Sequence, residues 1–285
     1  MAVFHIQISR GAKGAALNHA QYISRFGRFS VSRYGEVKAR GHANLPDWAG
    51  EDPMTFWRAS DAFERANGNA YREYEVALPR ELSRAAQVIL VCRFAAAEFG
   101  VTRPYQWVIY APLGGDGEEC PQARLLYSDR QLDGIKRTPE QFFKRYDPKK
   151  PERGGCKKAT YGANKIEAAR VYEKIRERWA TLQNQALERA GVAARVDHRS
   201  LVAQGILDRE PGVHRGRIVN AIEARGEVSE VGQAKRAQQQ RRADARARLI
   251  AELHAVDAEL ELRGFSAQPA ARIGDIMRPT VRDEK

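Results

Sequence analysis

Four polar side chains stand at strand spacing in two segments of this sequence. Gln122 and Arg124 lie two residues apart in ECPQARLLYSDR, which reads as the far arm of a β-hairpin, and Glu73 and Glu75 have the same spacing in YREYEVALP. Residues two apart in a strand point to one face, so each pair places its side chains next to each other. A guanidinium and an amide can bind phosphate oxygens, and paired carboxylates can hold a cation or a basic side chain. Taken alone, such a carboxylate pair is more often a solvated strand face.

The charge balance points to a polyanion as the partner. The 285 residues include 48 Lys and Arg against 36 Asp and Glu, which gives a formal net charge of +12. Nucleic acid is the first class to consider and an anionic membrane surface the second. No apolar run approaches the roughly 20 residues of a spanning helix, and no basic-then-apolar leader opens the chain. We therefore expect a cytoplasmic protein that binds nucleic acid and does not insert into a membrane.

Disulfide and zinc frameworks have little support. Cys92, Cys120 and Cys156 are odd in number and lack CxxC spacing, and none of the six histidines forms a His-x-His pair. These spacings argue against both kinds of site, so we interpret the cysteines as ordinary reduced thiols.

Alternating strand and helix patterns must position the polar residues. Up to residue 130 the order is β-α-β-α-β-β, with room for a further strand in the thirties. Helix start and stop signals include Pro53 in a first turn, a Ser83 cap and Gly100 at a helix end. This order predicts an α+β fold in which helices pack on one face of an antiparallel β-sheet. The expected strands cover residues 2–9, 69–79 and two arms within 103–130, and the expected helices cover 18–29, 51–68 and 83–100.

The second half of the chain is helical and basic. A long helix near 164–190 carries an apolar stripe that includes Ile166, Ile175 and Trp179, and it follows the basic Gly- and Pro-rich loop KRYDPKKPERGGCKKATYG, which we expect to be mobile on its own. We predict one domain over residues 1–226, including this helix. Residues 227–285 are predicted to form a basic helical tail that is exposed and builds no second core.

Several blocks of the sequence, taken in order, carry a family resemblance. NHAQYISRFGRF, EDPMTFWRASDAFERANG, YREYEVALPRELS, RVDHRSLVAQGI and PGVHRGRI are among those between residues 2 and 226. Together they resemble the MobA/MobL family of plasmid mobilisation relaxases. The resemblance implies a His-hydrophobic-His endonuclease fold whose antiparallel sheet binds single-stranded or hairpin DNA at a transfer origin. It also implies a tyrosine that attacks the nic phosphate, forms a 5′-phosphotyrosyl bond and later reverses it.

The resemblance assigns roles to individual residues. It implies that Tyr22 is the nucleophile, although a tyrosine on an amphipathic helix is more often a core or rim residue. Glu73 and Glu75 match acidic positions of the family. The basic segments and two histidines in family blocks are the expected DNA contacts: Arg25, Arg28, Lys144, Arg145, Lys149, Lys150, Lys157, Lys158, His198, Arg199 and His214. For the two histidines a structural role and a role as replacement metal ligands are the alternatives, and the ligand role is less favoured because their spacing does not suit it.

The sequence departs from the family at the metal site. The resemblance places the family's three metal-binding histidines at Tyr110, Gln122 and Arg124, so the ligands of the expected Mg²⁺ or Mn²⁺ are absent. No metal site is predicted at these positions. A phosphate transition state needs positive charge, which a fixed guanidinium can supply in place of a cation. Arg124 is therefore a candidate for that role, with Gln122 as a further hydrogen-bond donor.

Three functions remain open from the sequence. The first is a relaxase that is metal-independent or uses a rearranged site, the second is a relaxase fold that binds origin DNA without nicking, and the third is a general nucleic-acid-binding module. The tail is available to recruit accessory mobilisation proteins or a coupling protein, or to dimerise. A relaxase should prefer one hairpin-bearing single strand over random DNA, which a general binder should not.

Overall fold

A five-stranded antiparallel sheet organises the first part of the chain. The computed structural model describes residues 3–30, 36–114, 117–201, 203–206, 222 and 225–263. Within these residues the strand order is β1-β3-β5-β4-β2, and every pairing is antiparallel. The strand expected in the thirties is present as β2, at one edge. The strands are β1 (Ile6–Ala12), β2 (Val37–Ala43), β3 (Asn69–Ala77), β4 (Tyr105–Tyr110) and β5 (Gln122–Tyr127).

The helices α2 and α3 begin where the capping residues predict, and α3 also ends as predicted, but α1 ends at Ser24 and α2 at Phe63, before the predicted ends at residues 29 and 68. The side chain of Asp52 accepts two backbone N–H bonds at the start of α2, and Ser83 caps α3 in the same way. Gly100 ends α3 with a positive φ of 55°, a conformation that favours glycine. The helices are α1 (Ala16–Ser24), α2 (Pro53–Phe63), α3 (Arg84–Phe99), α4 (Pro139–Phe142), α5 (Lys165–Arg189) and α7 (Glu230–Leu262).

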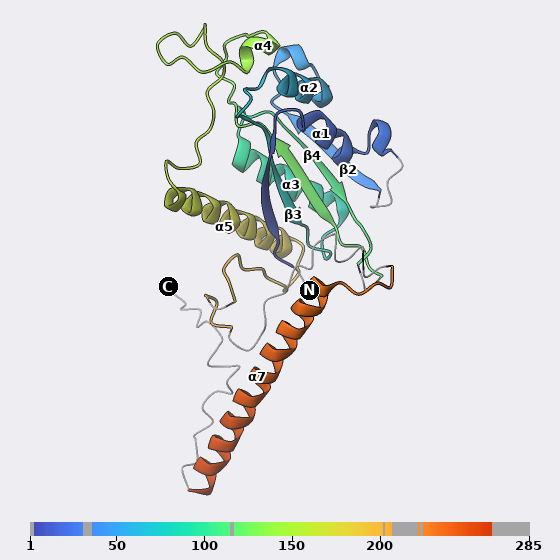
Figure 1. Cartoon of the computed structure of the whole chain (residues 1–285), viewed down its shortest axis with the longest axis vertical. Helices are drawn as coiled ribbons and strands as arrows, with labels where there is room; N and C mark the ends of the chain where they lie inside the picture. The colour runs from blue at the N-terminus through green and yellow to red at the C-terminus, as the bar shows by residue number, and fades with distance from the viewer. Residues whose placement is uncertain are drawn as a thin grey trace. The chain divides into compact units, whose positions relative to one another are not determined.

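One face of the sheet is covered by α3 and α5 (Figure 1). Tyr74 and Leu125 from the sheet, Phe94 from α3 and Trp179 from α5 form its buried core. Most of the predicted stripe of α5 points into this core. Ile166 does not, because it lies in the first turn and its side chain is largely exposed.

The second face carries α1 and α2 over part of its area. Helices therefore pack on both faces of the antiparallel sheet. The reason lies in the central strands, where consecutive residues are apolar: Trp107 and Leu125 bury against α3 and α5, whereas Val108 and Leu126 bury beneath α1 and α2. A strand with apolar residues at successive positions must be covered on both sides. Beyond these apolar residues, the second face holds the polar positions identified in the sequence.

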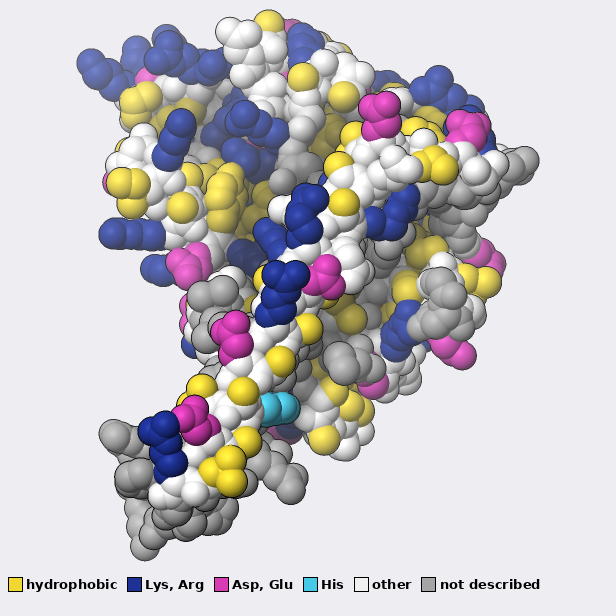
Figure 2. Space-filling model, turned by 60° about the horizontal axis from the view of Figure 1, so that its bottom comes forward, with side chains coloured by type: hydrophobic (Ala, Val, Ile, Leu, Met, Phe, Trp, Pro, Cys, Tyr) yellow, Lys and Arg dark blue, Asp and Glu magenta, His cyan; other side chains and the backbone are white. Residues whose placement is uncertain are grey.

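The chain divides into two compact units, residues 1–198 and 199–285. The domain boundary predicted near residue 226 stays a prediction. In the second unit, the described side chains of α7 are almost all exposed. On the face that Figure 2 shows, hydrophobic, basic and acidic side chains are interspersed along the described part of this helix. No helix among the described residues is long and apolar enough to cross a bilayer.

Candidate active site

The N-terminal end of α1 is attached to α2 by a single carboxylate. Asp61 of α2 accepts the backbone N–H groups of Gly14, Ala16 and Leu17 at 2.8, 2.9 and 2.8 Å. The N-cap residue Ala15 has no side chain that could accept them, so Asp61 satisfies the free N–H groups of this helix end. These three hydrogen bonds also determine where α1 crosses the second face of the sheet. His19 and Tyr22 lie one turn apart on this positioned helix.

Tyr22 is half-buried at the end of α1. Its ring meets the edge of Phe29 at a centroid distance of 5.5 Å, and the guanidinium carbon of Arg25 lies 4.9 Å from the ring centroid. Arg25 also donates a hydrogen bond of 2.7 Å to the carbonyl of Tyr22. Arg28 follows in the next turn, exposed and stacked over Phe29. The phenol thus has fixed positive charge beside it, and the ring is held on two sides.

His19 joins α1 to the carboxylate pair of β3. Its Nε2 lies 3.0 Å from Oε1 of Glu73, and its ring stacks on Tyr71 at a centroid distance of 4.8 Å and an interplanar angle of 7°. Ser9 donates a further hydrogen bond of 3.3 Å to Glu73. Burial alone would raise the pKa of Glu73, but the hydrogen bond and charge of His19 and the charge of Arg124 outweigh it, so the pKa is lowered. Glu73 is therefore a buried carboxylate that stays ionised.

Arg124 stands between the two carboxylates. Its guanidinium lies 2.6 Å from Glu75 and 3.6 Å from Glu73, and its Nε donates a hydrogen bond of 2.7 Å to the hydroxyl of Tyr110. Burial would lower the pKa of Arg124, but Glu73, Tyr110 and Glu75 raise it above its ordinary value, so the guanidinium keeps its charge. Burial, opposed by Arg124, raises the pKa of Tyr110 to about 12. Gln122 lies opposite Tyr110 in register, on the same face.

The residues at the family's ligand positions do not suit a divalent metal. Tyr110, Gln122 and Arg124 present a neutral phenol, an amide and a permanent cation, and the two nearest carboxylates are already paired with that cation. A metal ion placed there would meet electrostatic repulsion from the guanidinium. In the part of the chain that the structure describes, no group of three or more His, Cys, Asp or Glu could hold a metal ion. Hard divalent cations need several oxygen ligands, which this arrangement does not offer.

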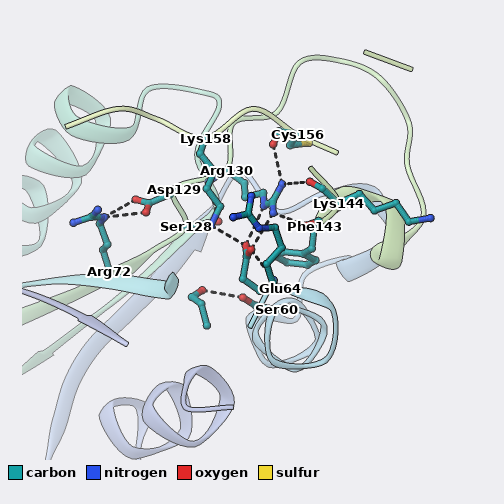
Figure 3. A network of polar contacts seen from close by, with 12 residues as sticks. Ser60, Glu64, Arg72, Ser128, Asp129, Arg130, Phe143, Lys144, Cys156 and Lys158 are labelled. Carbon is teal, nitrogen blue, oxygen red and sulfur yellow. Dashed lines mark hydrogen bonds and ion pairs between the residues drawn. The ribbon is translucent and has the colours of Figure 1, made fainter. Parts of the chain in front are cut away.

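A second polar network anchors the basic loop after β5 (Figure 3). Glu64, at the end of α2, accepts bonds from Arg130 at 3.0 and 3.1 Å and pairs with Lys158 at 3.1 Å. Arg130 also donates to the backbone carbonyls of Lys144 and Cys156 at 2.6 and 3.0 Å. Burial would raise the pKa of Glu64, but the bond and charge of Arg130 lower it. The loop that we expected to be mobile on its own is thus attached to a buried ion pair.

A second arginine holds the far arm of this loop. Arg137 donates to the carbonyls of Gly154 and Pro151 at 3.0 and 2.9 Å and pairs with Asp133 at 2.6 Å. The anchored backbone leaves most of the loop's basic side chains exposed, and the exposed ones are Lys144, Arg145, Lys149, Lys150, Arg153 and Lys157.

The structure brings some of the predicted site residues together and separates others. Tyr22, Arg25, Glu73, Glu75, Gln122 and Arg124 belong to α1 and the second face of the sheet. The residues of the basic loop form a separate group around Glu64. Lys158 belongs to this group and forms an ion pair with Glu64. His198 is half-buried beside Asp197, its Nδ1 lying 3.8 Å from a carboxylate oxygen, and Arg199 is exposed. His214 lies outside the described residues.

Sequence reasoning missed His19. The signal was available, because His19 and Tyr22 stand three residues apart and share one side of a helix. The sequence did not show that Glu73 is the partner of His19, because the two residues are 54 positions apart.

Known proteins resemble this chain in sequence. It is 43% identical over 211 residues to the "43 kDa relaxation protein" of Salmonella typhimurium, covering 74% of this chain and 57% of that protein. It is 41% identical over 230 residues to "Mobilization protein A" of Escherichia coli, covering 79% of this chain and 31% of that protein. The chain therefore spans less than two thirds of the length of either relative.

A solved structure shares the fold. The chain from work on the "Molecular Basis of Vancomycin Resistance Transfer in Staphylococcus aureus" superposes with a TM-score of 0.51 at 22% identity, over 70% of this chain and all of that one. The sequence model of the MobA/MobL family matches residues 33–225, which include β2 to α5 and leave Tyr22 just outside. With more than half of its length matched and with these relatives, this chain belongs to the MobA/MobL family.

Proposed function

We propose that this protein is a relaxase of plasmid mobilisation that nicks single-stranded or hairpin DNA at a transfer origin. Tyr22 is the nucleophile and forms a 5′-phosphotyrosyl bond. The observation that carries the proposal is the position of Tyr22, half-exposed beside Arg25 and one helical turn from the His19–Glu73–Arg124 chain. The names of the relatives, a relaxation protein and a mobilisation protein, support the same role.

The charges suggest how the phosphate is held. Arg124 carries one positive charge, but Glu73 and Glu75 carry two negative charges beside it. The nonbridging oxygens of a phosphate therefore gain less from Arg124 than from Arg25 and Arg28, whose guanidinium groups lie at the Tyr22 end of α1. We assign the phosphate contact first to these two arginines. Arg124 then serves mainly as the internal counter-charge of the carboxylate pair, a role in which no divalent metal is needed.

The test uses a single-stranded oligonucleotide that carries the cognate nic site. The protein is incubated with it, with and without a strong chelator, and a denaturing gel is read for a covalent adduct. We expect an adduct that survives the chelator and is abolished by Tyr22→Phe, because the hydroxyl is the proposed nucleophile. Noncovalent binding by this variant should stay within a few fold of the parent, because the hydroxyl adds little phosphate affinity.

Tyr105→Phe is the matched control, since this half-buried tyrosine lies on the opposite face of the sheet. It should form the adduct normally. An undiminished adduct in Tyr22→Phe would move the nucleophile elsewhere, and activity that vanishes with chelator and returns with manganese or magnesium would refute the metal-independent mechanism.

DNA binding without nicking is a second candidate function. The observation that favours it is that the three ligand positions hold a phenol, an amide and a guanidinium, and that Glu75 balances the charge of the guanidinium inside the protein. Selective binding to a hairpin-bearing origin strand, with no adduct under any metal condition, would support this candidate. Equal binding to random single strands at the same salt concentration would instead indicate a general nucleic-acid-binding module.

A further inference from the structure

We propose that His19, oriented by Glu73, is the general base that removes the phenolic proton of Tyr22 and so activates the nucleophile without a metal ion. The inference rests on the proposed function, because it concerns the first step of the nicking reaction. It assigns a role to His19, which lies in the block NHAQYISRFGRF but to which the family resemblance assigned none.

The imidazole is held next to the nucleophile by contacts on two sides. Its ring is stacked on Tyr71 at 4.8 Å, and its Nε2 lies 3.0 Å from Glu73. The centroids of the His19 and Tyr22 rings are 6.2 Å apart, with the planes tilted by 31°. Both residues project from one side of α1, whose N-terminus is fixed by Asp61. A base held this way needs little reorganisation to reach the hydroxyl.

The partner of His19 determines which nitrogen is basic. Glu73 is ionised, since His19 and Arg124 keep its pKa lowered against the effect of burial. An ionised carboxylate only accepts hydrogen bonds, so Nε2 of His19 carries the hydrogen. In the neutral imidazole the other nitrogen, Nδ1, then has the free lone pair and is the atom that can accept a proton. The Glu73–His19 pair thus has the arrangement of a carboxylate-oriented base.

The His19–Glu73 pair accounts for the proton in each step of the reaction. The O–H bond of Tyr22 breaks as Nδ1 of His19 takes the proton, and the phenolic oxygen forms a bond to phosphorus. The bond from phosphorus to the 3′ oxygen breaks, and the imidazolium returns the proton to that oxygen. Glu73 stabilises the imidazolium that exists between the two transfers. The products are a 5′-phosphotyrosyl bond and a free 3′-hydroxyl, with no other reactant required.

The charges around His19 come from each element packed against it. They are Glu73 and Tyr71 on β3, Arg124 on β5 through its contact with Glu73, Asp61 on α2, and Tyr22 with Arg25 at the end of α1. General-base catalysis requires the unprotonated form of the base. We therefore expect the rate of adduct formation to rise with pH until the base is fully unprotonated.

The experiment compares two variants of His19 in the full-length protein. His19→Gln retains an amide N–H that can donate to Glu73 but has no basic nitrogen. We expect its rate of adduct formation to fall by about 100- to 10,000-fold, with loss of the acid limb of the pH profile and with DNA affinity within a few fold. His19→Ala should regain part of its rate when imidazole is added to the buffer. His42→Gln is the matched control, because His42 also pairs with a carboxylate, Glu51, at 3.1 Å, and should react as the parent does.

The outcomes separate this inference from the proposed function. If the parent forms the Tyr22 adduct and His19→Gln forms it at an equal rate with the same pH profile, the inference is overturned and the relaxase function stands. A slow His19→Gln variant that keeps the acid limb, together with His19→Ala that imidazole does not rescue, would show a structural role and also overturn it. If the parent forms no adduct at any pH, both proposals fail. Thermal unfolding by circular dichroism checks that each variant is folded.

Discussion

The guanidinium of Arg124 lies 2.6 Å from the carboxylate of Glu75, and the two residues are direct partners in the register of β3 and β5. The same guanidinium reaches Glu73 and the hydroxyl of Tyr110. The sheet therefore contains its own cation at the place to which the MobA/MobL resemblance assigns the family's metal-binding histidines, which this sequence lacks. Because this cation is a side chain of β5, a chelator cannot remove it from the site.

Removing this cation should destabilise the fold. Arg124→Ala leaves two carboxylates close together on a largely buried face, with side chains 5% and 23% exposed. Breaking a buried ion pair by removing one partner costs about 3–5 kcal/mol, and Lys at this position should recover part of the loss because it keeps the charge without the forked geometry. Urea unfolding of the three proteins measures the difference. An unfolding free energy of Arg124→Ala equal to that of the parent would mean that the pair contributes little.

The removal should also slow nicking. Arg124 is the proposed counter-charge of Glu73, which orients the proposed base His19, so its loss should lower the rate of the proposed nicking reaction by about 100-fold, the lower end of the range for general-base catalysis. The measurement is the initial rate of adduct formation by Arg124→Ala at a temperature where the variant is folded. Arg93→Ala, an exposed arginine on α3 over the other face, is the control and should keep the parental rate. Equal rates for the two variants would remove Arg124 from the mechanism.

Restoring histidines should create a metal site. Tyr110→His, Gln122→His and Arg124→His together remove the guanidinium and place three imidazoles at positions that face each other in β4 and β5. Imidazole is a good ligand for transition metals, so the triple variant should bind Mn²⁺ in calorimetry where the parent shows no heat of binding at this site. A thermal unfolding midpoint that rises with Mn²⁺ gives a second readout independent of activity. If the triple variant binds no Mn²⁺, the three histidines are not sufficient, and the side chains around them must also differ from those of the family's metal site.

The Glu64–Arg130 pair should make stability depend on pH. The pKa of Glu64 is lowered from its ordinary 4.5, so its stabilising contribution is present above about pH 4.5 and is lost as the pH falls through the folded-state pKa. Urea unfolding between pH 3 and 7 should show this loss in the parent and a shallower slope in Glu64→Gln, which has no carboxylate to protonate. Glu140→Gln is the control, since this exposed carboxylate pairs with Lys144 at the surface. Equal slopes for the parent and Glu64→Gln would exclude Glu64 as the titrating group.

The anchored loop should contribute to DNA affinity by neutralising phosphates. We expect the affinity for single-stranded DNA to fall steeply as the salt concentration rises. The double variant Lys149→Gln, Lys150→Gln should reduce the slope of log affinity against log salt concentration by about 0.7 for each phosphate that is no longer neutralised. Fluorescence anisotropy with a labelled oligonucleotide measures it, with Arg93→Gln as the control on the other face. Affinity that does not change between low and moderate salt would argue against nucleic acid as the partner.

Local patterns along the chain predicted most of the strands and helices and the shared faces of several side chains, but not α4 or the ends of α1 and α2. Alternation located the strands, capping residues located α2 and α3, and spacing alone placed Glu73 with Glu75 and Gln122 with Arg124 on shared faces. These features depend on residues a few positions apart, where backbone geometry fixes the relation. The family resemblance supplied Tyr22, whose chemical role stays a prediction.

Which of these faces meet depends on the tertiary structure. His19 and Glu73 are 54 residues apart, and Glu64 and Arg130 are 66 apart, so no periodicity in the sequence links them. The loop of residues 144–158 reads as a mobile basic segment because its anchors, Arg130 and Glu64, lie outside it. Helices on both sides of the sheet likewise follow from how continuous apolar strands are packed. Side chains distant in sequence come together because the strand order β1-β3-β5-β4-β2 and the bond from Asp61 to α1 set their positions, and burial then makes their pairing necessary.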